Sequence, residues 1–231
     1  MLVWVASFPR SGNTLLRIAL HRRYGVTSSV VYDHDGVAGR LGGELIGYTE
    51  RPGSLAEMRA AAGPHFVKTH RPRDEDVDDA DAAICLVRDG RDALVSWARL
   101  LSEDDPASFP AVLRRRITDT DGRSSASWGT NVLSWLRPAA AHRVVLSYAE
   151  LIADPAAAAD RVMAVVAPGV RADLDAVIPR FEQLRQVDAG FFRRGVVGSH
   201  RDEFPPALLE LFWSRPDNRA AMQVLAASGT S

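Results

Sequence analysis

The sequence has little of three features that would define other classes of protein. Its one cysteine, Cys85, excludes a disulfide framework, and the apolar residues around it predict a small core side chain. No uninterrupted apolar run approaches the roughly 20 residues of a membrane helix. We expect no signal peptide and therefore a cytoplasmic location. The formal net charge of −1 argues against a strongly electrostatic nucleic-acid binder.

Lysine is almost absent as well. The single lysine is Lys68, in Phe66-Val67-Lys68-Thr69-His70, and every other residue of the Lys/Arg set is arginine. Lys68 and His70 are two residues apart, so on an extended strand their side chains share a face. This pairs a compact cation with an imidazole whose ordinary pKa of about 6.5 suits proton transfer near neutral pH. A solvated cation at a strand end is the alternative.

The length and the alternation of patterns predict one α/β domain over residues 1–231, built as a parallel sheet with helices on both faces. Strands are expected at 2–6, 28–32, 65–69, 83–87 and 143–147. Helices are expected at about 13–24, 54–62, 91–102, 107–117, 127–140, 156–166, 172–185 and 205–213. Residues 33–53, with six glycines, and residues 186–204 read as irregular, and long loops of this kind often shape a site.

The start of the chain predicts an anion site. The strand Leu2–Ala6 leads into Ser7-Phe8-Pro9-Arg10-Ser11-Gly12-Asn13-Thr14 and then into a helix, whose N-terminus offers unpaired N–H groups and a positive dipole end. Gly12 lets the backbone approach an anion, and Arg10 adds a fork-shaped cation. Ser11, Asn13 and Thr14 are suited to capping the helix. The loop is not a Walker A motif, because Asn13 rather than lysine precedes Thr14. An ordinary capped strand-to-helix turn is the plainer alternative.

A second cation stands at the end of another predicted strand. The apolar run from Ala83 ends at Arg88, a turn follows at Asp89-Gly90, and a helical pattern then contains Ser96. Arg88 is therefore expected at the strand exit, where ligands bind in open α/β sheets. Ser96 taken alone would be read as a packed helix serine.

These stretches together resemble the cytosolic-type sulfotransferases, which use 3′-phosphoadenosine 5′-phosphosulfate. Members of that family carry a Pro-Lys-Ser-Gly-Thr-Thr loop, a Lys-Thr-His segment, an Arg followed eight residues later by Ser, and an Arg-Lys-Gly-x-x-Gly segment. The corresponding stretches here are Pro9–Thr14, Lys68–His70, Arg88 with Ser96, and Arg193-Arg194-Gly195-Val196-Val197-Gly198. The matches follow the family order from near residue 2 to near residue 204, which implies the P-loop NTPase-like sulfotransferase fold.

The resemblance implies sulfuryl transfer from that donor to a hydroxyl of a small-molecule or natural-product acceptor, with 3′-phosphoadenosine 5′-phosphate as the product. It implies His70 as the general base, Lys68 and Arg10 at the transferring group, and no metal. It implies no nucleic-acid or membrane partner, and a monomer or homodimer. The implied nucleotide contacts are Arg10, Ser11, Gly12, Asn13, Thr14, Arg88, Ser96, Tyr148, Phe181, Arg193, Arg194 and Gly195.

The sequence departs from the family pattern at several places. Leu15 and Leu16 stand where the family's adenine-stacking Trp is expected, and Pro205-Pro206 replaces the central pair of its short dimer segment, so that dimer contact is expected to be absent or altered. Arg10 also resembles the tyrosyl-protein branch, which uses a carboxylate base. The carboxylates to consider for that role are Asp33, Asp35 and Glu44.

Other interpretations remain open at this stage. A kinase of the P-loop class would use magnesium-ATP, and a non-catalytic nucleotide-binding protein would show no dependence on His70. Asp33-His34-Asp35 lacks further metal-ligand spacing and is expected to be a solvated turn. Trp128 and Trp135, seven residues apart, are expected to face the core.

Overall fold

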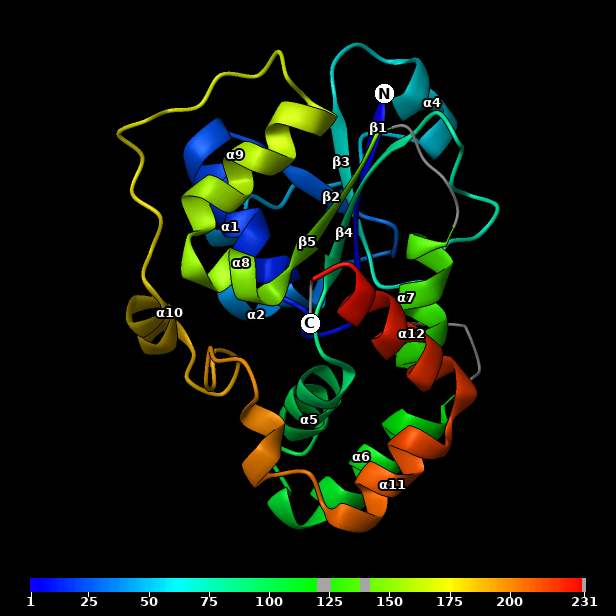
Figure 1. The fold of residues 1–231 in the computed structure, drawn as a ribbon. Coiled ribbons are helices and arrows are strands. Elements are labelled where there is room, and N and C mark those ends of the chain that lie inside the picture. Colours follow the sequence, from blue (N-terminus) through cyan, green and yellow to red (C-terminus); the bar gives the residue numbers. More distant parts are fainter. Residues whose placement is uncertain (120–125, 138–141, 230–231) are drawn as a thin grey trace.

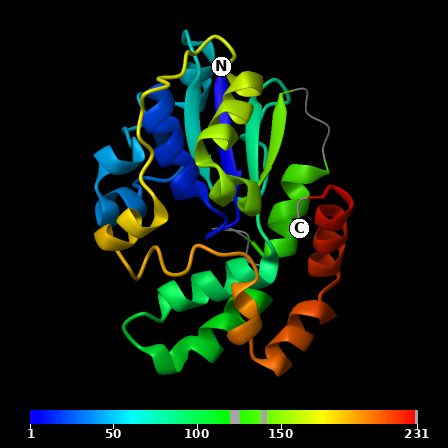
Figure 2. The same ribbon diagram turned by 60° about the vertical axis from the view of Figure 1, so that its left-hand side comes forward.

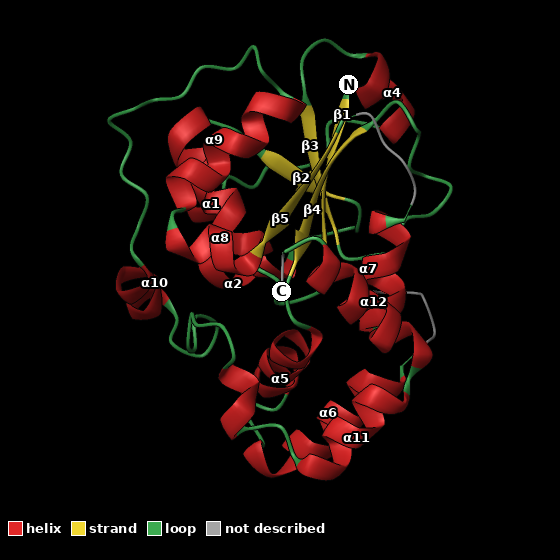
Figure 3. Ribbon diagram, in the orientation of Figure 1, coloured by secondary structure: helices red, strands yellow, loops and turns green. Residues whose placement is uncertain are grey.

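The computed structural model describes residues 1–119, 126–137 and 142–229. Its centre is a parallel five-stranded sheet in the order β2-β3-β1-β4-β5 (Figures 1 and 3). The strands are β1 (Leu2–Ser7), β2 (Ser28–Val30), β3 (His65–Thr69), β4 (Ala82–Val87) and β5 (Arg143–Ser147). Ala6 of β1 lies opposite Thr69 of β3 and Cys85 of β4, so the residues that follow these strands meet at one edge of the sheet.

Helices cover both faces of the sheet, because β1 and β4 are buried along their whole length and offer apolar side chains to either side. On one face α1 (Asn13–Tyr24) and α9 (Pro155–Val166) pack on each other and on the sheet. On the other face α4 (Leu55–Ala60) and α7 (Trp128–Leu136) contact β1. The predicted three-layer arrangement is confirmed, and so are the core positions of Trp128 and Trp135.

A further group of helices lies beyond the carboxyl edge of the sheet (Figures 1 and 2). These are α5 (Gly90–Leu101), α6 (Phe109–Thr118) and α11 (Pro206–Ser214), while α12 (Pro216–Ala227) packs on α7. The remaining helices are α2 (Gly36–Leu41), α3 (Gly43–Ile46), α8 (Tyr148–Ala153), α10 (Phe181–Val187) and the 3₁₀ turns η1 (Pro106–Ser108) and η2 (Ser199–Asp202). Within the described ranges, none of the helices is both long and apolar enough to cross a membrane.

The strand predictions are confirmed, whereas some helix predictions are wrong. Residues 172–180 form no helix, since Asp173 bonds the amide of Asp175 with its side chain at 3.0 Å and Pro179 disfavours the helical conformation before it. The segment 33–53 contains α2 and α3, which are too short for a periodic signal. Both α8 and α12 were missed. The predicted helix end at 138–140 lies outside the described residues.

Gly129 sets how closely α12 approaches α7. A Cβ at this position would overlap the backbone of Asp217, and the Gly129 amide donates to Asn218 Oδ1 at 3.1 Å. We expect Gly129→Ala to lower the free energy of unfolding by about 1–3 kcal/mol, because backbone cannot move aside as a flexible side chain does. Gly169→Ala, where a Cβ meets nothing within 4 Å, is the control and should change it by less than about 0.5 kcal/mol. Denaturant titration compares the two, and equal effects would contradict this account of the helix contact.

Candidate active site

A pocket of about 440 Å³ opens where the strands end. Its walls come from the carboxyl ends of β1, β3 and β4, from α2 and α5, and from the segment that follows α10. In Figure 2 this last segment, coloured orange, passes between the edge of the sheet and α5. The residues predicted from the sequence that line the pocket are Arg10, Gly12, Asn13, Thr14, Lys68, His70, Arg88, Ser96, Tyr148, Phe181, Arg193, Arg194 and Gly195. Ser11 is buried beside it.

Hydrogen bonds hold both the ring and the backbone of His70 in place. Its ring Nδ1 lies 2.9 Å from the carbonyl oxygen of Ser7, which can only accept a hydrogen bond, so Nδ1 carries the proton and Nε2 keeps its lone pair. The backbone N–H of His70 donates to Tyr32 Oη at 2.7 Å, and Asn131 Nδ2 donates to the His70 carbonyl at 2.8 Å. The geometry therefore presents Nε2 as the nitrogen able to take a proton.

The pKa of His70 is not the ordinary one that the sequence analysis expected. Burial lowers it well below 6.5, and the positive charges of Lys68, Arg17 and Arg10 lower it further against the opposing bond to Ser7. The expectation was wrong because a single sequence does not show how many cations the fold gathers around one ring. His70 is consequently neutral at physiological pH, in the form that accepts a proton.

Lys68 is buried and is not a solvated strand-end cation, since its side chain is only 6% exposed. Its ammonium lies 5.3 Å from the centre of the Tyr32 ring. Burial lowers the pKa of Lys68 to about 8; Asp35 opposes this shift and Arg17 adds to it. The group is therefore still charged at neutral pH, but at a cost in stability.

Asp35 does not lie in a solvated turn, and that expectation was wrong. Its buried carboxylate forms a 2.6 Å ion pair with Arg17 Nη1 and accepts the amide of Val37 at the start of α2. Burial alone would raise the pKa of Asp35, but the charges of Arg17 and Lys68 and these hydrogen bonds hold it below its usual value. Asp35 lines the pocket as an engaged carboxylate, whereas Asp33 and Glu44 are exposed and lie outside the pocket wall.

The loop before α1 is built differently from the predicted cap. Gly12, at φ 103°, is the N-cap, and no described side chain caps the helix; the predicted capping by Ser11, Asn13 or Thr14 is wrong. Asn13 Nδ2 instead donates to Val5 O at 3.1 Å and to Ser7 Oγ at 3.2 Å, while Ser11 Oγ is buried with no hydrogen-bond partner in the described ranges. The N-terminal amides of α1 thus remain available to an anion.

Arg10 turns its guanidinium into the pocket. Nε donates to Ser96 Oγ at 3.2 Å, Nη2 donates to the carbonyl of Phe191, and the group stacks 4.2 Å from the centre of the Phe191 ring. Burial, together with the charges of Arg88, Arg40 and Arg193, lowers the pKa of Arg10 to about 10. Three other arginines thus act on the charge of Arg10 in addition to its burial.

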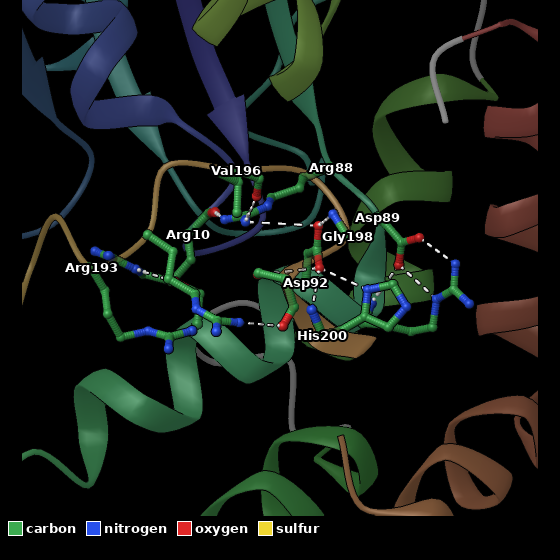
Figure 4. A network of polar contacts seen from close by, with 12 residues as sticks. Arg10, Arg88, Asp89, Asp92, Arg193, Val196, Gly198 and His200 are labelled. Atoms are coloured by element: carbon green, nitrogen blue, oxygen red, sulfur yellow. Dashed lines mark hydrogen bonds and ion pairs between the residues drawn. The ribbon is translucent and has the colours of Figure 1, made fainter. Parts of the chain in front are cut away.

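Arg88 connects two loops (Figure 4). Nη1 donates to Arg10 O at 3.0 Å and Nη2 donates to Val196 O at 3.2 Å, while the group stacks 4.0 Å from the centre of the Tyr148 ring. Its Nε is buried and has no partner among the residues that the structure describes. Arg88 therefore bonds directly to the segment that carries Arg193.

We call residues 191–200 the arginine loop. Gly195 is packed against Phe181, whose ring a Cβ there would meet at 2.6 Å. Arg193 Nη1 and Arg194 Nη1 lie 2.7 and 3.2 Å from Glu203 Oε1. Sequence reasoning missed several pocket residues, namely Tyr32, Arg40, Trp97, Phe191 and Phe192. Phe191 and Phe192 immediately precede Arg193 in the sequence, and this position next to a predicted nucleotide contact could have indicated that they line the pocket.

The burial of Lys68 predicts a gain in stability when its charge is removed. Lys68→Met should raise the free energy of unfolding at pH 7 by about 1–3 kcal/mol, because a buried ammonium without compensating bonds costs folding energy. The gain is full below pH 8, where both folded and unfolded chains are protonated. It shrinks as the pH rises from 8 to 10.5, because the folded chain releases the proton first.

Denaturant titrations of the two proteins at pH 7 and 10 measure this difference. Arg22→Met, which removes an exposed cation from α1, is the matched control and should stay within about 0.5 kcal/mol of the parent at both pH values. A Lys68→Met protein that is less stable than the parent at pH 7 would contradict the conclusion that the buried charge of Lys68 lowers the stability of the fold.

Comparisons with known proteins agree with this geometry. The mouse sulfotransferase SULT7A1, solved in complex with PAP, superposes with a TM-score of 0.64 at 17% identity over 97% of this chain and 88% of that one. Retinol dehydratase, solved with androsterone and inactive cofactor PAP, gives 0.62 at 18% identity over 92% and 78%. At these identities the likeness shows the fold. A search of the curated proteins found no significant match.

The family is shown by the sequence itself. The model of the sulfotransferase domain matches residues 2–167, which is well over half of the chain. The chain therefore belongs to the sulfotransferase family.

Proposed function

We propose that this chain transfers a sulfuryl group from 3′-phosphoadenosine 5′-phosphosulfate to a hydroxyl of a small-molecule acceptor. The observation that carries the proposal is one pocket in which the free Nε2 of His70 faces a concentration of arginine and lysine charge. Family membership and neighbours solved with PAP support the choice of donor.

The residues present fit a ligand with two separate phosphate positions. One is at the N-terminus of α1, where Ser11 Oγ has no partner within the described part of the chain. The other is near Ser96 and the arginine loop, where Arg88 Nε and Arg193 Nε likewise have none there. Buried donors of this kind normally find partners, so a ligand that accepts from them would satisfy the site. Tyr148 and Phe181 add aromatic surface to the same pocket.

The proposed chemistry asks for positioning and charge rather than covalent catalysis. When bound, the donor supplies the sulfuryl group. His70 Nε2 takes the acceptor proton, and the Nδ1–H bond to the Ser7 carbonyl stabilises the charged ring that results. Lys68 and Arg10 hold positive charge beside the reacting centre. Tyr32 keeps the backbone of His70 in place.

The acceptor should combine one hydroxyl with an apolar body. The pocket wall on the side of α2 and α5 includes Val37, Trp97, Leu100 and Phe191. Retinol dehydratase was solved with androsterone in one complex and with retinol in another, and both complexes contain PAP. We extend that class of hydroxylated ligand to this chain as part of the proposal.

The donor assignment predicts a nucleotide preference. 3′-Phosphoadenosine 5′-phosphate at about 100 times its Kd should stabilise the fold by about 2.7 kcal/mol, and AMP at the same concentration should stabilise it much less because it lacks the second phosphate. Thermal denaturation with each nucleotide measures this. Arg88→Ala should abolish most of the difference, while Arg22→Ala should keep it. Equal shifts from both nucleotides, or a larger shift from magnesium-ATP, would refute the proposed donor.

The base assignment predicts a selective loss of turnover. His70→Ala should reduce kcat by about 10²- to 10⁴-fold, the usual contribution of a positioned acid–base group, with nucleotide affinity within about twofold of the parent. His65→Ala, at the other end of β3, is the matched control and should keep kcat.

The pH profile gives a second test of His70. Because the pKa of His70 lies well below 6.5, its ring is already deprotonated at pH 6.5, and kcat/KM should fall only at lower pH, as the ring gains its proton. An acid limb centred above pH 6.5 would contradict the assignment of the base.

A further inference from the structure

Asp92 is the least exposed acidic residue of the site, and the proposed reaction gives it no role. It lies in the first turn of α5, four residues after Arg88, and its relative exposure is 0%. An acid in that position suits the helix dipole, but the dipole alone does not require burial. A fully buried carboxylate is costly unless several donors compensate it.

The donors that compensate Asp92 come mostly from one short stretch of the arginine loop (Figure 4). Oδ2 accepts the amide of Gly198 at 2.7 Å, and Oδ1 accepts both the amide and Nδ1 of His200 at 2.8 and 2.7 Å. Ser199 Oγ lies 3.4 Å from Oδ1. These contacts join residues 106 to 108 positions apart, so they are a tertiary tie rather than a local turn.

The backbone of the loop depends on this tie. Gly198 is in the left-handed region at φ 77° and precedes η2, so its amide has no partner in a regular element. The side chain of Asp92 is the acceptor that the structure gives for the amides of Gly198 and His200. Removing the carboxylate would leave these buried or half-buried donors unsatisfied.

Arg88 completes the arrangement from the other side. Its Nη2 lies 3.8 Å from Asp92 Oδ2 and donates to Val196 O at 3.2 Å. Burial would raise the pKa of Asp92, but the charge of Arg88 and the bonds from His200 and Gly198 keep it below the usual value, so the carboxylate is ionised. The ionised carboxylate of Asp92 therefore lies close to Arg88 and bonds to Gly198 and His200.

We propose that Asp92 is a positioning residue for donor binding: its carboxylate ties Gly198 and His200 of the arginine loop to the first turn of α5. This inference rests on the proposed function, since the loop it ties carries Arg193 and Arg194. With the tie in place, Arg88, which precedes α5, and the arginines of the loop are held in the same pocket before the nucleotide arrives. The binding energy of the nucleotide is then not spent on ordering ten residues of loop.

Asp92→Asn tests the tie with little change in shape. One side of the amide would present N–H groups to the N–H donors of Gly198 or His200. The affinity for 3′-phosphoadenosine 5′-phosphate, measured by calorimetry below the melting temperature, should fall about 10- to 100-fold. The donor KM should rise in parallel, while kcat at saturating donor stays within about twofold, because Asp92 does not touch the reacting atoms.

Asp89→Asn is the matched control from the same turn. Asp89 contacts Arg91, its neighbour along the chain, and asparagine is an equally good helix N-cap, so nucleotide affinity should not change. His200→Leu removes the side-chain donor alone and should weaken binding less than Asp92→Asn. His200→Asn, whose amide replaces Nδ1, should restore most of that loss. When His200→Leu is combined with Asp92→Asn, the loss of nucleotide affinity should be smaller than the sum of the two single losses.

Hydrogen exchange measures the tie without any ligand. Peptides covering 196–202 should exchange about tenfold faster in Asp92→Asn than in the parent or in Asp89→Asn. Unchanged exchange, or faster exchange with undiminished nucleotide affinity, would overturn the inference while leaving the proposed function intact. A parent chain that does not bind the nucleotide would instead refute the proposed function, and this inference with it.

Discussion

The pairing of β1 between β3 and β4 is the constraint on which the site depends. Because all three strands are parallel and in register at Ala6, Thr69 and Cys85, the residues that follow them leave the sheet at one edge. The Ser7 carbonyl consequently reaches His70, and the Arg10 carbonyl reaches Arg88, although these partners are 63 and 78 residues apart. The backbone of β1 and its loop therefore orients both His70, the proposed base, and Arg88, which is proposed to bind a phosphate of the nucleotide. A slip of one residue in this register would separate them, since it would turn alternate side chains to the opposite face.

The second constraint is electrostatic. The fold buries Lys68 and gathers Arg10 and Arg88 near it, and the pKa values of Lys68 and Arg10 fall as a result. Burial, together with the charges of Lys68, Arg17 and Arg10, lowers the pKa of His70 and keeps its ring neutral. Buried positive charge of this kind lowers the stability of the folded chain when no anion is bound and is compensated when an anion binds. Such a cost in the unbound state is typical of a binding site. The apolar layers on both faces of the sheet supply the stability that permits it.

The sequence allowed much of the fold to be predicted, because buried parallel strands produce continuous apolar runs that end at polar residues. The resemblance to the cytosolic-type sulfotransferases implied that Lys68, His70, Arg88 and Ser96 would gather with the loop at Arg10, and the structure brings them together in one pocket. What the sequence could not supply was tertiary. The bond between His70 and Ser7 selects the tautomer, and the lowered pKa of His70 depends on burial. Residues 172–180 of the helix expected at 172–185 form no helix, because the turn at Asp173 and Pro179 overrides the apolar spacing, and α10 begins only at Phe181.

The carboxylates around the pocket are arranged so that positive charge remains at its centre. At the rim, Glu203 pairs with Arg99 and Arg193, and Arg40 pairs with Asp188 and Glu103. Further in, the structure gives Arg10 and Arg88 mainly carbonyl and hydroxyl partners, which fix a guanidinium without cancelling its charge. Asp92 is the acid nearest to Arg88, and backbone and imidazole donors from the arginine loop engage both of its oxygens. A carboxylate engaged in this way stabilises the loop while neutralising little of the charge on Arg88. The structure thus holds the cationic site in shape without cancelling its charge, and an uncancelled positive charge of this kind favours the binding of an anion.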